Sequence, residues 1–130
     1  MNKIIKLIFI FITLAWSLNS QAVITASGEN GSHEGKEKAF DNDVNTKWLT
    51  FNSTGWIQKD FGEAVRLTDY SIVSGNDAQG RDPRDWQILG SSDGSSWQTL
   101  DTRSGESFSQ RRQSRHFSVP SQSDVRYIRL

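Results

Sequence analysis

Apolar and polar positions alternate in short runs along the chain from Val23 to Leu130. The alternation is clearest in Trp86, Ile88 and Gly90. Clusters of Gly, Asn, Asp and Ser interrupt the runs roughly every 8–12 residues, which is typical of all-β domains. A period of two places one side of each strand in a core and the other side in solvent. The pattern therefore predicts a domain built of short strands.

The expected strands form two packed antiparallel sheets. They cover residues 23–26, 55–61, 65–73, 85–91, 96–103, 114–119 and 125–130. Within 65–73 the apolar phase slips once between Leu67 and Tyr70, as it would at a β-bulge. Only residues 34–40 carry a helical pattern. About seven short strands separated by turns favour a β-sandwich in one domain.

Residues 1–22 carry the pattern of a secretory signal peptide, and residues 23–130 form the expected domain. Lys3 and Lys6 precede the apolar stretch 7–18, and Ser20 and Ala22 supply small residues at a cleavage site. The stretch is shorter than the roughly 20 residues of a membrane-spanning helix. An uncleaved N-terminal anchor is the alternative, since Trp16 lies late in the segment. Both interpretations place the domain outside the cytosol: secreted and extracellular, or periplasmic if the source is Gram-negative.

The last residues, Val125 to Leu130, stop inside an expected strand with no turn residues after them. Proteins usually protect a strand that lies at a sheet edge. We therefore expect that the sandwich lacks its C-terminal strand, and that a catalytic or adhesive domain follows it.

The charge balance argues against a nucleic-acid partner. The chain has 15 Lys and Arg against 15 Asp and Glu, and loss of the N-terminal lysines would leave an acidic excess. A nucleic-acid binder needs a basic face, and the one basic concentration is the short segment with Arg111, Arg112, Arg115 and His116. We interpret that segment as a solvated hairpin. The chain has no cysteine, so core packing, helped by any bound metal, must stabilise it.

Residues 38–48 concentrate oxygen-bearing side chains in one loop. Asp41, Asp43 and Asn45 have the spacing that begins an EF-hand loop, and hard oxygens in a tight turn suit Ca²⁺. Thr46 stands where that loop needs Gly, and no flanking helices are expected, which argues against an EF-hand. An ordinary turn capped by Asp and Asn side chains is the alternative explanation.

The sequence contains no recognisable catalytic constellation. It has no nucleophile elbow, no zinc-binding helix with paired histidines and no cysteine nucleophile. Asp82 with Asp85, and Asp60 with Glu63, are close enough in sequence to suggest a glycosidase pair. Both pairs adjoin turns, and we interpret them as structural. The sequence therefore predicts a binding module rather than an enzyme.

Several segments match one known family in order and spacing. They are Lys38-Ala39-Phe40-Asp41 with Thr46 and Trp48, Gly55-Trp56-Ile57-Gln58 with Asp60-Phe61-Gly62, Ser74-Gly75-Asn76-Asp77 with Arg81-Asp82-Pro83-Arg84-Asp85-Trp86, Gly90-Ser91-Ser92-Asp93-Gly94-Ser95-Ser96-Trp97, and Arg126-Tyr127-Ile128-Arg129-Leu130. Through these segments, residues 26–130 resemble the discoidin or coagulation factor 5/8 type C domains, which are similar to family 32 carbohydrate-binding modules. The resemblance implies an all-β, antiparallel jelly-roll sandwich of the galactose-binding-like fold.

The resemblance also implies a structural Ca²⁺ ion in the loop 38–46. Lys38 and Asp43 would give backbone carbonyls, Asp41 a carboxylate oxygen, and Thr46 its carbonyl and its hydroxyl. In the family a Glu near the C-terminal strand completes the shell, and that strand lies beyond Leu130. An ion surrounded by protein oxygens has no open position for a substrate, so we expect it to hold the loop.

Carbohydrate-binding relatives contact their ligand with loops at one end of the sandwich. The candidates in this chain are His33, Glu34, Asn76, Asp77 and Arg81. Such side chains can hydrogen-bond vicinal hydroxyls, and an aromatic ring usually covers the apolar face of the sugar. These loops carry no aromatic residue, and Phe51 is the nearest substitute.

The implied partner is an extracellular glycan. One alternative is adhesion to a protein or cell-surface receptor, as in discoidin-type modules. Another is an accessory role in a larger secreted hydrolase. The loops 27–36 and 76–84 are polar, so membrane insertion is not expected.

Two further expectations concern side chains near strand ends. Trp48, Trp56, Trp86 and Trp97 are expected mainly in the core, because aromatic side chains bury large areas. A stacking platform for a sugar ring is the alternative for one of them. Arg81-Asp82-Pro83 is expected to be a turn pinned by an internal ion pair.

Overall fold

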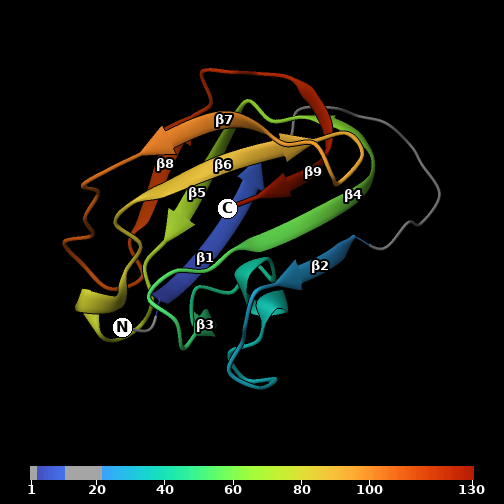
Figure 1. Cartoon of the computed structure of the whole chain (residues 1–130). Coiled ribbons are helices and arrows are strands. Elements are labelled where there is room, and N and C mark those ends of the chain that lie inside the picture. The colour runs from blue at the N-terminus through green and yellow to red at the C-terminus, as the bar shows by residue number, and fades with distance from the viewer. Residues whose placement is uncertain (1–2, 11–21) are drawn as a thin grey trace.

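The computed structural model describes residues 3–10 and 22–130 and is an antiparallel all-β structure (Figure 1). Its strands are β1 (Lys3–Ile10), β2 (Val23–Ala26), β3 (Trp48–Thr50), β4 (Ile57–Arg66), β5 (Asp69–Val73), β6 (Trp86–Ser91), β7 (Gln98–Arg103), β8 (Ser114–Ser118) and β9 (Asp124–Arg129). Two short 3₁₀ helices, η1 (Lys36–Ala39) and η2 (Gln79–Arg81), lie in the connections. The predicted fold class is confirmed.

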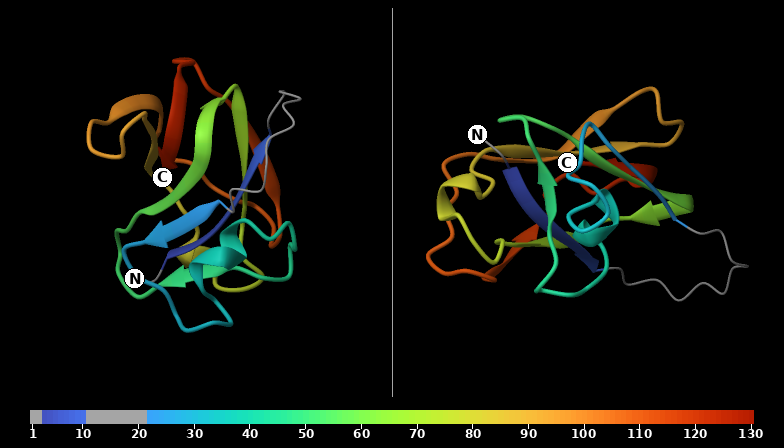
Figure 2. Two further views of the ribbon diagram at one scale, coloured as in Figure 1. Left: turned by 90° about the vertical axis from the view of Figure 1, so that its right-hand side faces the viewer. Right: turned by 90° about the horizontal axis from the view of Figure 1, so that it is seen from below.

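The strands form two sheets. One has the order β3-β1-β5-β8 and the other β2-β4-β9-β6-β7, with every pair antiparallel. Neighbours in a sheet are mostly distant in sequence, so the loops at the ends of the sandwich bring remote segments together. Figure 2 shows η1 beside β2 and the short β3 at one edge.

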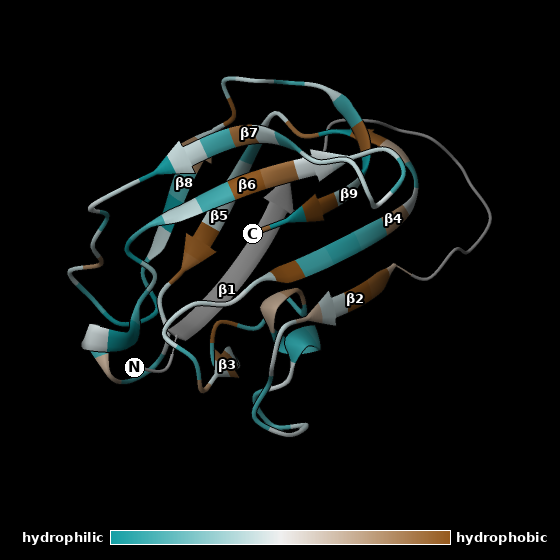
Figure 3. Cartoon of the chain, in the orientation of Figure 1, coloured by the Kyte–Doolittle hydropathy of each residue, from teal (hydrophilic) through white to brown (hydrophobic). Residues whose placement is uncertain are grey.

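Apolar side chains between the sheets form the core. The largest fully buried ones are Trp48, Tyr70, Phe108, Ile57, Leu67, Ile72, Ile88, Leu100 and Ile128. Figure 3 shows apolar residues along β5, β6 and β9 and polar residues in most of the connecting loops. Gly90 of β6 is required here, because a Cβ atom would lie 2.8 Å from side-chain carbons of Leu100 and Val125.

A buried polar chain crosses this core. The Tyr70 hydroxyl donates to Asp101 Oδ2 (2.7 Å) and accepts a hydrogen bond from Trp86 Nε1 (2.8 Å). Arg103 Nε donates to the same Asp101 carboxylate oxygen (2.8 Å) and balances the charge of this buried carboxylate. Burial, helped by the Asp101 hydrogen bond, raises the pKa of Tyr70. The hydroxyl therefore stays protonated and acts as a donor.

Most predicted strands are found within a few residues of their expected bounds, and η1 lies inside the predicted helical segment 34–40. The single strand predicted at 65–73 is wrong. β4 ends at Arg66 and β5 begins at Asp69, because the chain leaves one sheet there and enters the other. The phase slip marks this crossing and not a bulge. The irregular register of β4 with β9 lies earlier, between Asp60 and Val65.

Strand β1 lies inside the segment predicted to be a signal peptide. It pairs with β3 on one side, at Lys3 to Ile5, and with β5 on the other, at Lys6 to Ile10. Most of the rest of the predicted signal, residues 11–21, is outside the described residues, and its cleavage stays a prediction. No helix in the described parts of the chain is long and apolar enough to cross a membrane.

The interpretation of the basic segment at 111–116 as a solvated hairpin is wrong for two of its arginines. Arg111 forms a bidentate ion pair with Asp82. Arg115 lies 2.6 Å from the Glu106 carboxylate and over the rings of Phe108 and Phe117. Both arginines tie loops together.

Candidate functional site

Three of the five predicted ligand residues converge on one buried lysine, and a fourth lies beside one of the three. The Lys47 side chain is 9% exposed, and its Nζ donates to Asn76 Oδ1 and Asp77 Oδ1, both at 2.8 Å. Its Nζ also lies 3.2 Å from Glu34 Oε1. Arg81 Nη2 lies 3.6 Å from the other Asp77 oxygen. We call these five residues the Lys47 cluster.

The Lys47 cluster is electrostatically balanced. The two cations, Lys47 and Arg81, face the carboxylates of Glu34 and Asp77. The hydrogen bond from Lys47 is the main cause that lowers the pKa of Asp77. Because a buried ammonium must be paired, Lys47 holds the loop 27–35 and the loop after β5 in a fixed relation. Sequence reasoning missed it, and its only signal was a lysine directly before the predicted core residue at position 48.

The structure places His33 apart from the others. His33 is exposed, next to Glu34 but not among the partners of Lys47. It remains a candidate at the rim of the same loop.

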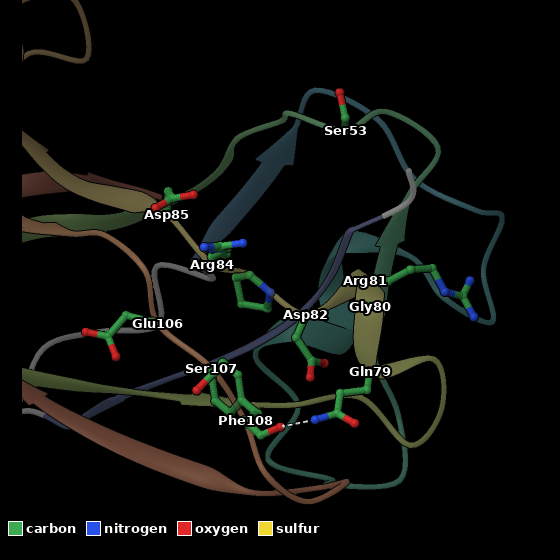
Figure 4. Close-up of a pocket in the computed structure, with 11 residues that line it drawn as sticks. Ser53, Gln79, Gly80, Arg81, Asp82, Arg84, Asp85, Glu106, Ser107 and Phe108 are labelled. Carbon is green, nitrogen blue, oxygen red and sulfur yellow. Dashed lines mark hydrogen bonds between the residues drawn. The ribbon is translucent and has the colours of Figure 1, made fainter.

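A pocket of about 440 Å³ opens beside the Lys47 cluster and shares Arg81 with it. Its other lining residues are Ser53, Gln79, Gly80, Asp82, Pro83, Arg84, Asp85, Glu106, Ser107 and Phe108. Figure 4 shows this loop-end pocket, with the Arg81 side chain extending away from Arg84 and the Gln79 amide donating to the Phe108 carbonyl (2.8 Å).

The acidic residues of the loop-end pocket have partners inside the protein. Asp82 pairs with Arg111, and Glu106 pairs with Arg115. Asp85 Oδ1 accepts hydrogen bonds from the Ser104 hydroxyl (3.0 Å) and the Gly105 amide (2.9 Å). Arg84 is exposed and has no ion pair among the described residues. The pocket therefore offers a cation and several polar groups to a ligand.

These contacts also correct the expected turn at 81–83. Arg81 and Asp82 do not pair with each other. Arg81 lies near Asp77 and Asp82 binds Arg111, so the turn is pinned by neighbouring loops and not by an internal ion pair.

The two carboxylate pairs that the sequence suggested for a glycosidase, Asp82 with Asp85 and Asp60 with Glu63, do not have the features of catalytic carboxyl groups. Asp60 accepts two hydrogen bonds from Arg126 (2.8 and 2.9 Å), and this contact is the main cause that lowers its pKa. A general acid needs a raised pKa to hold its proton near neutral pH. Asp82 is occupied by its ion pair with Arg111.

The four predicted metal-ligating residues also lie together, Lys38 within η1 and the other three in the loop after it. Thr46 Oγ1 is 2.6 Å from Asp41 Oδ2 and 3.0 Å from the Asp43 carbonyl oxygen. The Asp43 amide donates to Asp41 Oδ1 (3.0 Å), and Lys38 Nζ is 3.9 Å from Asp41 Oδ2. Asn42 has φ of 59°, the left-handed conformation that folds the loop back on itself.

The oxygen set of this loop fits a hard cation such as Ca²⁺. A carboxylate, a carbonyl and a hydroxyl converge at the Asp41, Asp43 and Thr46 positions. The described residues contain no group of three or more His, Cys, Asp or Glu side chains suited to a metal. A cation here would therefore depend on backbone and hydroxyl oxygens.

The four tryptophans that were predicted to lie in the core divide into two kinds. Trp48 and Trp86 are buried in the core, as predicted. Trp56 and Trp97 are only partly buried, so the prediction is wrong for them. Both contact Arg129, whose guanidinium carbon lies 4.6 Å from the Trp56 ring centroid and 4.1 Å from that of Trp97.

The chain belongs to the family described as F5/8 type C domain, whose family model matches residues 23–130. The family expectation is confirmed, and a domain of this type is generally a non-catalytic binding module.

One relative is a peptide-N(4)-(N-acetyl-β-glucosaminyl)asparagine amidase from Arabidopsis thaliana, 34% identical over 101 residues. The match covers 74% of this chain and 14% of that protein, so the chain spans only a small part of the relative's length.

Two solved structures show the same fold. The F5/8 type C domain of a Bacteroides fragilis protein has a TM-score of 0.72 at 19% identity, covering 85% of this chain and 80% of that one. The family 32 carbohydrate-binding module of Clostridium perfringens NanJ, solved with galactose, has a TM-score of 0.67 at 16% identity and the same coverage of each chain. The domain is therefore structurally like carbohydrate-binding modules.

Proposed function

We propose that this domain is a non-catalytic, extracellular glycan-binding module whose ligand lies at the loop end, over the Lys47 cluster and the loop-end pocket. The observation that carries the proposal is the convergence of Glu34, Asn76 and Asp77 on Lys47. Side chains from two distant loops are thereby held before any ligand arrives. Such preorganisation reduces the entropic cost of binding.

Each part of the loop end has a use in sugar recognition. Arg81 and Arg84 offer several N–H donors to hydroxyl oxygens, and Asn76 offers an amide beside them. Phe51 is 60% exposed and belongs to the loop that contributes Ser53 to the pocket wall. Its ring can cover the apolar face of a sugar. The fold likeness to a module solved with galactose supports a carbohydrate as the ligand.

We propose further that the loop 38–46 holds a structural Ca²⁺ ion. Asp41 would supply the carboxylate, Asp43 and Lys38 carbonyl oxygens, and Thr46 its hydroxyl and carbonyl. The bound ion would supply a fixed positive charge that keeps the loop in one conformation. Since η1 and this loop lead directly into Lys47, the loop also sets the position of the Lys47 cluster.

The larger setting of the domain is proposed from its relative. The amidase match covers a short part of a long protein. We propose that this domain is part of a larger exported chain and directs it to a glycan surface.

A glycan array followed by calorimetry on the purified chain tests the proposal. Binding to a coherent set of glycans is expected, and Arg81→Gln should weaken it about tenfold or more, the usual effect of losing a hydrogen bond from a charged group. Arg66→Gln is the matched control, because Arg66 pairs with Asp124 in an exposed ion pair away from the loop end. No binding by the folded chain, or equal loss in both variants, would overturn the proposal.

A further inference from the structure

Arg129 differs from the other arginines in the described part of the chain. Six of them have a carboxylate partner: Arg66, Arg81, Arg103, Arg111, Arg115 and Arg126. Arg84 and Arg112 have none but are exposed. Arg129 is partly buried and has none either. A guanidinium that is partly removed from water without a counter-charge is suited to an anion.

The Arg129 guanidinium is held rigidly from three directions. Its guanidinium carbon lies over the rings of both Trp56 and Trp97, 4.6 and 4.1 Å from their centroids. Gln58 Oε1 accepts hydrogen bonds from Nε (3.1 Å) and Nη2 (2.7 Å). An arginine has five N–H donors. Gln58 therefore leaves the edge formed by Nη1 and the second Nη2 hydrogen without a hydrogen bond to any described residue.

That remaining edge matches a carboxylate. Two parallel N–H groups of a guanidinium can bind both oxygens of a carboxylate at once. Stacking on an indole fixes the plane of the guanidinium, and this favours a carboxylate that lies in the same plane. Lysine, a point charge on a flexible stem, would not provide this geometry.

The surface around Arg129 has room for a ring. Gln58, Arg129 and Leu89 are register neighbours on β4, β9 and β6, so they form a row across the five-stranded sheet. A depression of about 260 Å³ lies along this row, with Trp56, Leu89 and Arg129 in its wall. A second depression of about 260 Å³ is lined by Trp97.

We propose that Trp56, Arg129 and Trp97 form a second binding site on the face of the five-stranded sheet, and that its ligand is a sugar ring bearing a carboxylate, a uronic acid residue. The carboxylate binds the open edge of Arg129. The apolar face of the ring packs on Trp56 and Leu89. The site is separate from the Lys47 cluster and does not require a ligand there.

The two sites are connected along the surface. The depression beside Trp56 shares Pro83 and Asp85 with the loop-end pocket. The Asp85 carboxylate is occupied by Ser104 and Gly105, which reduces its repulsion of an anionic ligand. A polysaccharide chain with acidic rings can therefore contact both sites.

An NMR titration with trigalacturonate tests the proposal on the full chain, because tryptophan indole N–H resonances report each site separately. The Trp56 and Trp97 resonances should move. Those of Trp48 and Trp86 should not, since their Nε1 atoms donate to the Gly28 carbonyl (2.8 Å) and to the Tyr70 hydroxyl (2.8 Å) inside the protein. Galactotriose is the neutral control and should leave Trp56 and Trp97 unchanged.

Variants separate a binding role from a structural one. Arg129→Gln should weaken trigalacturonate binding about tenfold or more, and Arg129→Lys should not restore it. Arg126→Gln is the control on the same strand, because Arg126 already pairs with Asp60. Undisturbed Trp48 and Trp86 resonances confirm that each variant is folded.

Four outcomes would overturn the proposal. Unmoved Trp56 and Trp97 resonances at high trigalacturonate would remove the site. Equal movement with galactotriose would show that binding does not depend on the sugar carboxylate. Equal or larger movement with triglutamate would assign the surface to an acidic peptide. Full trigalacturonate affinity in Arg129→Gln would show that Arg129 does not bind the ligand. Absence of glycan binding at the loop end is a separate result. It would leave the Asn76 side-chain amide resonance unmoved and would not affect the response of the Trp56 and Trp97 indole resonances.

Discussion

Lys47 and Arg129 are both cations partly or fully removed from water, yet their surroundings are opposite. Lys47 has two carboxylates and an amide oxygen around one ammonium. Arg129 has two indole rings and a neutral amide. The protein's own anions thus satisfy Lys47, which braces the loops, whereas Arg129 keeps an edge for an external anion. A buried charge that is paired inside the protein can therefore position the loops that meet a ligand, whereas an unpaired one such as Arg129 can bind an external anion itself.

The largest expected effect is on stability at Lys47. Lys47→Met should lower the free energy of unfolding by about 3 kcal/mol, because it leaves the Glu34 carboxylate without its cation and Asp77 with only the more distant Arg81. Arg129→Met should lower it by less than about 1 kcal/mol, since no carboxylate is left unpaired. Urea denaturation of both variants measures the difference. Equal losses would show that the two cations play the same structural role.

Calcium extends the comparison to a bound ion. If the loop 38–46 binds Ca²⁺, the ion at a hundredfold excess over its Kd should raise the free energy of unfolding by about 2.7 kcal/mol. Asp41→Ala should abolish this rise. Thermal unfolding with calcium and with chelator measures it, and Asp93→Ala, a turn residue elsewhere, is the control. A calcium response that survives Asp41→Ala would place the ion at another site.

The tryptophan faces around Arg129 make a smaller contribution. Trp97→Ala should lower the free energy of unfolding by about 1 kcal/mol, combining one lost cation–π contact with a partly buried ring. Chemical denaturation measures it, with Arg129→Gln and the double variant completing a cycle. Strictly additive losses would show that the ring and the guanidinium do not interact.

The smallest expected effect is on pH dependence. The hydrogen bond from Lys47 lowers the pKa of Asp77. The resulting stabilisation is present above the ordinary Asp pKa of about 3.9 and is lost as the pH falls through the lowered folded-state value. Because Asp77 is half exposed, we expect well under about 1 kcal/mol. Thermal unfolding of the wild type and Asp77→Asn from neutral to acid pH measures it, and identical pH profiles would contradict the contribution.

The strand pattern was predictable where one side of a strand faces solvent. β6 follows its alternation closely, since Trp86 and Ile88 are buried while Gln87 is exposed. β3 was not predicted, because three buried residues cannot show a period. The β4–β5 crossing was mistaken for a bulge, since both change the apolar phase and only the partner strands distinguish them.

The candidate residues were predictable in type but not in arrangement. Asp41, Asp43 and Thr46 lie within a few positions, so their proximity follows from local chain geometry. Glu34 and Asp77 meet only through Lys47, which has no motif of its own. The Arg129 stack joins residues from three separate segments, and the prediction of core positions for Trp56 and Trp97 missed it.

The sequence by itself determined the all-β fold, the family and the oxygen-rich loop. These depend on short-range periodicity and on motifs whose spacing is written along the chain. The tertiary structure alone decided which charges are paired, because strands adjacent in a sheet come from distant segments. The pairing of Lys47 with Glu34 and Asp77, and the absence of a carboxylate partner for Arg129 among the described residues, follow from that packing.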